Sequence, residues 1–166
     1  MPTARPDFAP TAVASAPFSV PAETVWRCRL DFSNLPQYNP DVSGVERVRD
    51  GAADAVGGTL GPGARYAFGL ADGRQPGTSN PIELWIIEAE EPTLVTAGMA
   101  GGNEAYEEFV IRPLDEGHCE ATLTLWLTLP DGLDERTLAA AAAGALGQIE
   151  KEVRLMKEVL EGRAGT

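Results

Sequence analysis

The sequence predicts an α+β fold in which one antiparallel sheet of seven strands curves around a long C-terminal helix. Three observations carry this prediction. After Pro40, short apolar runs alternate with turn residues, as in a meander of strands. Residues 119–129 alternate strictly between apolar and polar side chains. Residues 133–162 carry an apolar stripe at three- and four-residue steps, which is typical of an amphipathic helix.

The segment before Pro40 predicts one strand followed by two short helices. Residues 11–20 form a weakly patterned strand. Pro21 then suits the first position of a helix, because its missing N–H donor has no partner there in any case. The prolines and asparagines of residues 34–40 limit a second helix to one or two turns. Residues 1–10 contain prolines and no periodicity, so they are expected to form a flexible leader.

Six further strands complete the predicted sheet. They are separated by turns rich in glycine, proline or acidic residues, and are expected over residues 42–49, 64–70, 82–89, 94–100, 104–112 and 119–129. Long loops are expected at 51–63 and 72–81. In the last strand the apolar face lies on the core, whereas Trp126 lies on the polar face. Trp126 either covers the outer side of the sheet, which we favour, or meets a partner.

The C-terminal helix is predicted to start after Asp131, an N-cap with Asp134 three residues on, and to end at residue 162. About 30 residues at 1.5 Å each make a rod of roughly 45 Å. Residues 139–147 are almost entirely alanine and glycine. Two interpretations stay open: the small side chains leave a space above the sheet, or alanine simply favours the helix and lets it approach closely. The domain then covers residues 11–162, with a tail at 163–166.

Composition disfavours several classes of partner. A length of 166 residues corresponds to one domain. Thirteen basic residues against 25 acidic ones give a net charge of −12, which repels phosphate backbones and anionic lipids, so no nucleic-acid partner is expected. No segment approaches the roughly 18 apolar residues of a membrane span. The N-terminus lacks the apolar stretch of a signal peptide, and a cytoplasmic location is predicted.

Common catalytic and metal-binding motifs are missing from the sequence. His118, the one histidine, lies in a hairpin turn and is expected at the surface, which argues against a histidine triad. Cys28 and Cys119 are isolated thiols, expected as small buried residues rather than zinc ligands. The glycines of residues 58–63 precede a strand and not a helix, so they indicate a hairpin loop and not a phosphate cradle. No metal or cofactor is predicted, and no catalytic residue is identified.

Glu107 is the acidic residue with two open interpretations. It shares a strand face with Phe109 and Ile111. If that face is the inner one, a carboxyl group points into the interior, where it needs a partner or takes up a proton, as groups at binding and catalytic sites do. If Glu107 lies close enough to the start of the strand, it reaches solvent instead.

The order of elements resembles the START-like (helix-grip, SRPBCC) superfamily over about residues 11–162. Residues 18–26, Phe-Ser-Val-Pro-Ala-Glu-Thr-Val-Trp, look like the strand-to-helix entry of that superfamily. Tyr38 and Pro40 stand where it has an aromatic residue and a proline before the second strand. Residues 109–113 resemble its sixth strand. Within the superfamily the likeness is to the polyketide cyclase/dehydrase and lipid-transport group.

That resemblance implies a function. Members of the group are similar in holding an apolar or aromatic, polyketide- or lipid-like small molecule between sheet and helix. By this resemblance a ligand-binding cavity would be lined by Tyr38, Tyr66, Phe68, Phe109, Leu125, Leu127, Ala142, Leu146 and Ile149, with Glu107 added if its face is the inner one. We expect about 300 Å³ or more beneath residues 142–146.

Catalysis and a second class of function stay open. An enzyme of this kind would be a cyclase or dehydrase that uses neither a metal nor a histidine triad. The alternative is a protein-interaction module resembling the chaperone-activator members of the superfamily, which would use the acidic surface. A homodimer is also left open.

Overall fold

The computed structural model describes residues 2–53, 57–70 and 81–164, and the predicted α+β helix-grip architecture is confirmed. The elements follow in the order β1 (Ala12–Phe18), α1 (Ala22–Leu30), the 3-10 turn η1 (Phe32–Asn34), α2 (Leu35–Tyr38), β2 (Val42–Arg49), β3 (Arg65–Leu70), β4 (Ile82–Glu90), β5 (Leu94–Ala100), β6 (Ala105–Asp115), β7 (His118–Leu127) and α3 (Glu135–Ala164). The predicted loop at 72–81 falls, except for Pro81, outside the described residues, as do residues 54–56 of the other long loop.

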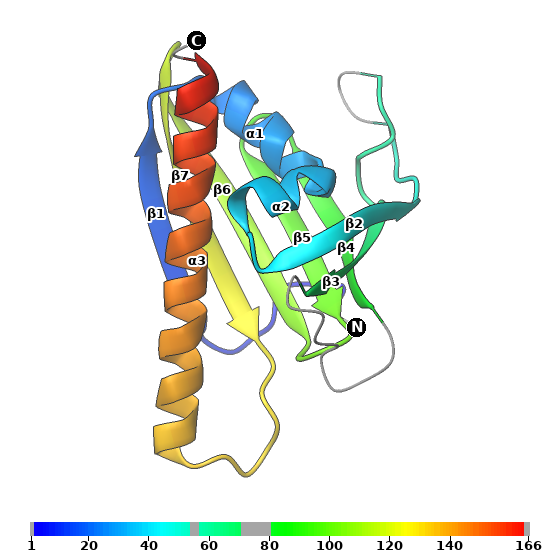
Figure 1. Ribbon diagram of the computed structural model, residues 1–166, viewed down its shortest axis with the longest axis vertical. Coiled ribbons are helices and arrows are strands. Elements are labelled where there is room, and N and C mark those ends of the chain that lie inside the picture. The colour runs from blue at the N-terminus through cyan, green and yellow to red at the C-terminus, as the bar shows by residue number, and fades with distance from the viewer. Residues whose placement is uncertain (1, 54–56, 71–80, 165–166) are drawn as a thin grey trace.

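The seven strands form one sheet in the order β1-β7-β6-β5-β4-β3-β2, and every neighbouring pair is antiparallel. Figure 1 shows the three helices on one side of this curved sheet, with α3 beside β1 and with α1 and α2 over the central strands. The C-terminal half of α3 lies beside α1 and α2, whereas its N-terminal half extends past them (Figure 1). The main core fills the space between the helices and the concave face of the sheet.

Strand alternation decides which side chains enter that core. On β6, Glu107, Phe109 and Ile111 all point to the inner side and are 8%, 0% and 1% exposed. The partner strand β7 places Ala121 and Leu123 on the same side. Of the two interpretations of Glu107, the buried one is therefore correct.

The convex face is covered by the residues before β1. The indole Nε1 of Trp126 donates to the carbonyl oxygen of Phe8 at 3.1 Å, and that of Trp85 donates to the carbonyl oxygen of Pro2 at 3.1 Å. The guanidinium carbon of Arg5 lies 5.1 Å from the centre of the Trp126 ring. Trp126 is 2% exposed, so it covers the outer side of the sheet, as we favoured. The segment predicted as a flexible leader supplies these contacts.

The start of α3 differs from the prediction. The helix begins at Glu135, and the side chain of Asp134 caps it by accepting from the backbone N–H of Thr137 at 2.7 Å. The predicted cap, Asp131, was wrong because Gly132 follows it with a φ of +82°, a left-handed turn that delays the helix. Both isolated cysteines are buried free thiols, as expected.

Candidate ligand-binding cavity

A cavity of about 350 Å³ lies between the concave face of the sheet, α2 and the middle of α3. Ten of its described lining residues are apolar: Phe32, Leu35, Val42, Phe68, Leu70, Ile82, Leu84, Met99, Leu125 and Ile149. Six are polar: Arg29, Asn39, Asp41, Glu107, Gln148 and Glu152. This volume and this mostly apolar lining are typical of small-molecule sites, which reach from about 300 to 1,000 Å³.

Secondary-structure periodicity brings these residues together. On β3, Phe68 and Leu70 are two positions apart and share the concave face. On α3, Gln148, Ile149 and Glu152 lie within one turn and share the face that points toward the sheet. The cavity is thus formed by side chains whose orientation the strands and helices fix before any ligand arrives.

One guanidinium lies between two carboxylates at the polar end of the cavity. The Nη1 atom of Arg29 is 2.6 Å from Oε1 of Glu152, and its Nη2 atom is 2.5 Å from Oε1 of Glu107. Arg29 comes from α1, Glu107 from β6 and Glu152 from α3, and we call these three residues the buried triad. The guanidinium carbon of Arg29 also lies 4.9 Å from the ring centre of Phe32 and 5.2 Å from that of Phe109.

Two amide side chains extend this network toward the cavity rim. Asn39 donates from Nδ2 to Oε2 of Glu152 at 3.1 Å. Gln148 in turn donates from Nε2 to Oδ1 of Asn39 at 3.1 Å. The chain of hydrogen bonds therefore ties the end of α2 to α3 and occupies both carboxylate oxygens of Glu152.

Burial and charge act on the triad in opposite directions. Burial raises the pKa of Glu107, and the neighbouring Glu152 adds to this, while Arg29 lowers the pKa. For Arg29, burial by itself lowers the pKa, but Glu107 and Glu152 raise it above the ordinary value, so the guanidinium keeps its charge. With both carboxylates ionised the triad carries a net charge of −1. Burial of the Glu107 carboxyl group, reinforced by the charge of Glu152, therefore raises the pKa of Glu107.

Tyr38 and Tyr66, the two tyrosines of the predicted site, stay neutral at physiological pH. Burial raises the pKa of Tyr66 to about 12, and burial also raises the pKa of Tyr38. Both side chains are inaccessible to solvent. Tyr66 packs against Phe32, with 5.7 Å between the ring centres, and Tyr38 lies 6.0 Å from the guanidinium carbon of Arg29.

The structure brings some of the predicted site residues together and leaves others apart. Four of them line the cavity: Phe68, Glu107, Leu125 and Ile149. Three are buried in the adjacent core: Tyr38, Tyr66 and Phe109. The other three, Leu127, Ala142 and Leu146, are absent from the described lining, and Leu146 is 36% exposed.

The position of the cavity along α3 differs from the expected one. It lies beside residues 148–152 and not beneath residues 142–146. The alanine-rich half of α3 extends past α1 and α2 (Figure 1), and its residues 139–147 are exposed or half-buried. Alanine content therefore indicated neither a void nor a close approach to the sheet.

Five polar lining residues were missed from the sequence: Arg29, Asn39, Asp41, Gln148 and Glu152. Two of them carried a usable signal. Arg29 lies four positions after Val25 and therefore on the buried face of α1. Glu152 lies three positions after Ile149 and four before Met156, on the apolar stripe of α3. A charged residue inside an apolar stripe of helical spacing predicts a buried charge that needs a partner.

Other chemistry has little support among the residues that the structure describes. No group of three or more histidine, cysteine or acidic side chains within residues 2–53, 57–70 and 81–164 could hold a metal ion. His118 is exposed and lies 2.8 Å from Oδ1 of Asp115, at the turn between β6 and β7. In the same part of the chain, no helix has the length and hydropathy that a membrane crossing requires.

Solved structures similar to this chain share its fold. An aromatase/cyclase, ZhuI, from Streptomyces sp. R1128 matches with a TM-score of 0.68 at 12% identity, covering 92% of this chain and 94% of the other. TTHA0849 from Thermus thermophilus matches with a TM-score of 0.67 at 16% identity, covering 92% and 97%. The di-domain aromatase/cyclase BexL of the BE-7585A biosynthetic pathway matches with a TM-score of 0.67 at 15% identity, covering 90% and 46%.

Sequence comparison gives the family. No curated protein matches the chain. A family model described as "Polyketide cyclase / dehydrase and lipid transport" matches residues 9–161, which is nearly the whole sequence. The helix-grip fold agrees with this match, as does the structural likeness to a START superfamily protein from Mycobacterium smegmatis, with a TM-score of 0.58 at 16% identity over 91% of this chain and 97% of the other. The chain therefore belongs to the polyketide cyclase/dehydrase and lipid-transport family.

Proposed function

We propose that this protein binds an apolar or aromatic small molecule in the cavity between the sheet and α3. The observation that carries the proposal is the cavity itself, about 350 Å³ with ten apolar lining residues and a hydrogen-bonded network of Arg29, Glu107, Glu152, Asn39 and Gln148. Apolar walls supply affinity, because they remove ligand surface from water. A few convergent polar groups then fix the orientation of the ligand.

The family suggests a reaction as well as binding, and we propose cyclase- or dehydrase-type chemistry as the finer possibility. ZhuI and BexL, two of the structurally similar proteins, are aromatase/cyclases. Such reactions move protons, and Glu107 is a cavity-lining carboxyl group whose pKa is raised by burial. Glu107 is accordingly the side chain that we assign to proton transfer if turnover is found.

The test of binding is a variant that fills the cavity. Leu125 is half-buried on β7 and lines the cavity, so Leu125→Trp places an indole inside it. Ala142→Trp adds the same side chain on α3 outside the described lining and is the matched control. The probe is N-phenyl-1-naphthylamine, a neutral aromatic molecule whose fluorescence rises in apolar surroundings.

We expect the parent protein and Ala142→Trp to bind the probe with similar affinity, and Leu125→Trp to bind at least about tenfold more weakly. Circular dichroism checks that both variants are folded. If Leu70→Trp, a second cavity-filling change on β3, and Leu125→Trp both bind as well as the parent, the probe sits elsewhere and the proposal is wrong. Native mass spectrometry of freshly purified protein then identifies any molecule that is retained.

The protein-interaction alternative loses one of its supports. Trp126, the residue that would offer an aromatic contact to a partner, is buried beneath the segment before β1. A stoichiometric protein partner recovered from lysate, together with no small molecule in the native mass spectrum, would favour this alternative over a ligand-binding role.

A further inference from the structure

The carboxylate oxygens of the buried triad are not all occupied. Glu152 uses Oε1 for Arg29 and Oε2 for Asn39. Glu107 uses Oε1 for Arg29, but its Oε2 has no hydrogen-bond partner among the residues that the structure describes. Since Glu107 lines the cavity, this oxygen is the acceptor that the triad offers to a bound molecule, while the buried Nε of Arg29 is its unpartnered donor.

The cavity also has an excess of negative charge. Its described lining contains three carboxylates, Asp41, Glu107 and Glu152, against the single guanidinium of Arg29. Asp41 lies at the rim, where its Oδ2 is 3.7 Å from Nζ of Lys151. The inner pair of carboxylates must therefore share Arg29, which is 1% exposed and already contacts both.

A second carboxylate charge in an apolar interior is unfavourable unless something compensates it. Without a ligand, the raised pKa of Glu107 lets a proton do so, and a ligand of opposite charge can take the place of that proton. Aromatic rings in the same wall support the same ligand chemistry. Phe32 and Phe68 both line the cavity, and the face of an aromatic ring attracts cations. The guanidinium of Arg29 already uses Phe32 in this way.

We propose that the ligand is an apolar or aromatic amine, whose protonated nitrogen donates a hydrogen bond to Oε2 of Glu107. The proposal rests on the ligand-binding function argued above and specifies its substrate class. The ammonium group balances the charge of the triad, and the apolar body of the molecule contacts the ten apolar lining residues. A carboxylate of the same shape would meet Glu107 and Glu152 with like charge.

The experiment compares three probes that share one ring system: 1-naphthylmethylamine, 1-naphthalenemethanol and 1-naphthoic acid. Isothermal titration calorimetry at about pH 8 measures the affinity of each for the parent protein. We expect the ammonium probe to bind at least about tenfold more tightly than the alcohol, and the carboxylate to bind most weakly.

Glu107→Gln keeps the shape of the side chain and removes its charge, so the amine and the alcohol should bind to this variant with nearly equal affinity. Glu108→Gln is the matched control, because it removes the same charge from the adjacent position of β6, on the convex face. We expect Glu108→Gln to keep the preference of the parent.

Each outcome is decisive. If the alcohol or the carboxylate binds to the parent as tightly as the amine, the amine proposal is overturned while ligand binding stands. The same holds if Glu107→Gln keeps the full preference. If none of the three probes nor the neutral probe used above binds to the parent, the proposed function itself fails, and this inference with it. The ranking in the parent needs no variant, so a Glu107→Gln protein that does not fold leaves the test intact.

Discussion

The two halves of α3 have opposite surroundings, although they belong to one unbroken helix. From Ile149, at the middle of the helix, to its C-terminal end, Ile149, Val153, Met156 and Leu160 are all at most 4% exposed. In the N-terminal half, Leu138 is 41% and Leu146 is 36% exposed.

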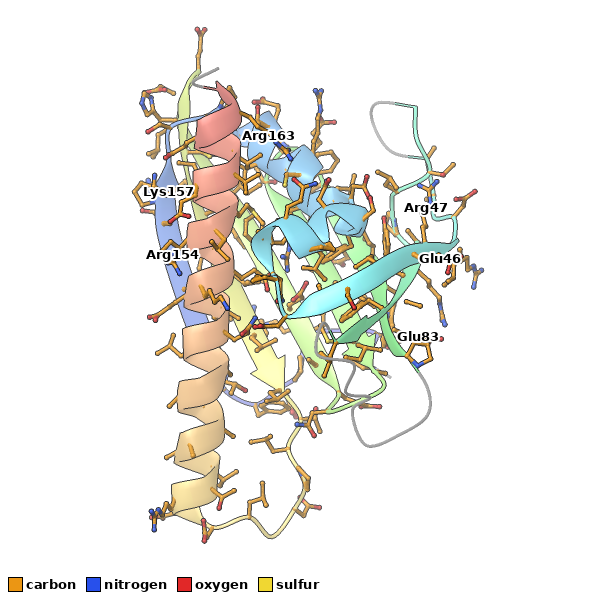
Figure 2. All side chains as sticks on the ribbon, in the orientation of Figure 1. Glu46, Arg47, Glu83, Arg154, Lys157 and Arg163 are labelled. Atoms are coloured by element: carbon orange, nitrogen blue, oxygen red, sulfur yellow. The ribbon has the colours of Figure 1, made fainter. Side chains whose placement is uncertain are left out.

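The polar contacts differ in the same way. Figure 2 shows Arg154, Lys157 and Arg163 on the C-terminal half of the helix, where they lie close to β1 and α1. Lys157 donates from Nζ to the carbonyl oxygen of Pro17 at 2.5 Å and to Oε1 of Glu161 at 2.6 Å. The C-terminal half therefore anchors the helix to the sheet, and the cavity lies at the turn where this anchoring begins.

We expect the largest loss of stability when the triad is disrupted, because the triad joins the anchored half of α3 to the core. Arg29→Met leaves Glu107 and Glu152 facing each other without the guanidinium. Breaking a buried ion pair in this way costs about 3–5 kcal/mol in the free energy of unfolding, measured by urea denaturation. Arg154→Met is the control, because its pair with Glu158 is more than half exposed and we expect a change below about 1 kcal/mol. Equal losses in the two variants would contradict the buried triad.

The second prediction compares apolar side chains in the two halves directly. Met156 is inaccessible to solvent, so Met156→Ala removes packing and leaves a cavity, which costs about 2–5 kcal/mol. Leu146→Ala changes a partly exposed side chain and should alter stability by no more than about 0.5 kcal/mol. Chemical denaturation of both variants measures the difference. A Leu146→Ala protein as unstable as Met156→Ala would show that the N-terminal half is packed in solution.

The third prediction concerns pH and the one buried carboxyl group whose pKa is raised. In the unfolded chain Glu107 loses its proton near the ordinary value of 4.5, whereas the folded protein holds it to a higher pH. The stabilisation from this group is therefore complete below the unfolded value and is lost as pH rises through the raised, folded value. Arg29, Tyr38 and Glu152 come from the three helices around Glu107; burial contributes most to its raised pKa, Arg29 lowers the pKa and Glu152 raises it.

The measurement is the free energy of unfolding as a function of pH. In Glu107→Gln the decline above about pH 4.5 should become shallower than in the parent, while Glu108→Gln should keep it. Because a single charge changes, the effect is smaller than the loss in Arg29→Met. Parallel curves for the parent and Glu107→Gln would mean that the carboxyl titrates normally.

The smallest predicted effect is an increase in the free energy of unfolding, caused by glycine-to-alanine substitutions in the N-terminal half of α3. A Cβ added at Gly144 or at Gly147 would meet no atom within 4 Å, so alanine there restricts the unfolded chain without a clash. Each substitution should raise the free energy of unfolding by about 0.5–1 kcal/mol. The matched contrast is Gly98→Ala on β5, whose Cβ would lie 2.5 Å from the ring of Trp85 and so should destabilise. Melting temperatures measure both changes. A lower melting temperature for Gly144→Ala would show that a neighbouring group covers this face of α3.

Most of the fold could be predicted from periodicity. The strand predicted over 42–49 is observed as Val42–Arg49 and that over 94–100 as Leu94–Ala100. Alternation also identified β7 and the inward-facing set of Glu107, although not which face was inner. That decision depends on the curvature of the whole sheet, which no single strand encodes.

The candidate site was predicted less well because long-range pairing creates it. Arg29 and Glu107 are 78 positions apart, and Arg29 and Glu152 are 123 apart, so no local pattern shows that they meet. Of the residues expected from the resemblance to the family, Phe68, Leu125 and Ile149 line the cavity. Its choice of Ala142 and Leu146 was misplaced, since the composition of a helix does not say how far along its length the sheet extends.

The lining of the cavity has a practical consequence for finding what binds there. Its described residues come from all three helices and from six of the seven strands. A molecule held by so many elements must be released when the chain unfolds, so mass action opposes global melting. At a concentration one hundred times its Kd, such a molecule stabilises the fold by about 2.7 kcal/mol. Screening a library of compounds by thermal shift therefore reports occupancy directly, without a label and without knowledge of the reaction.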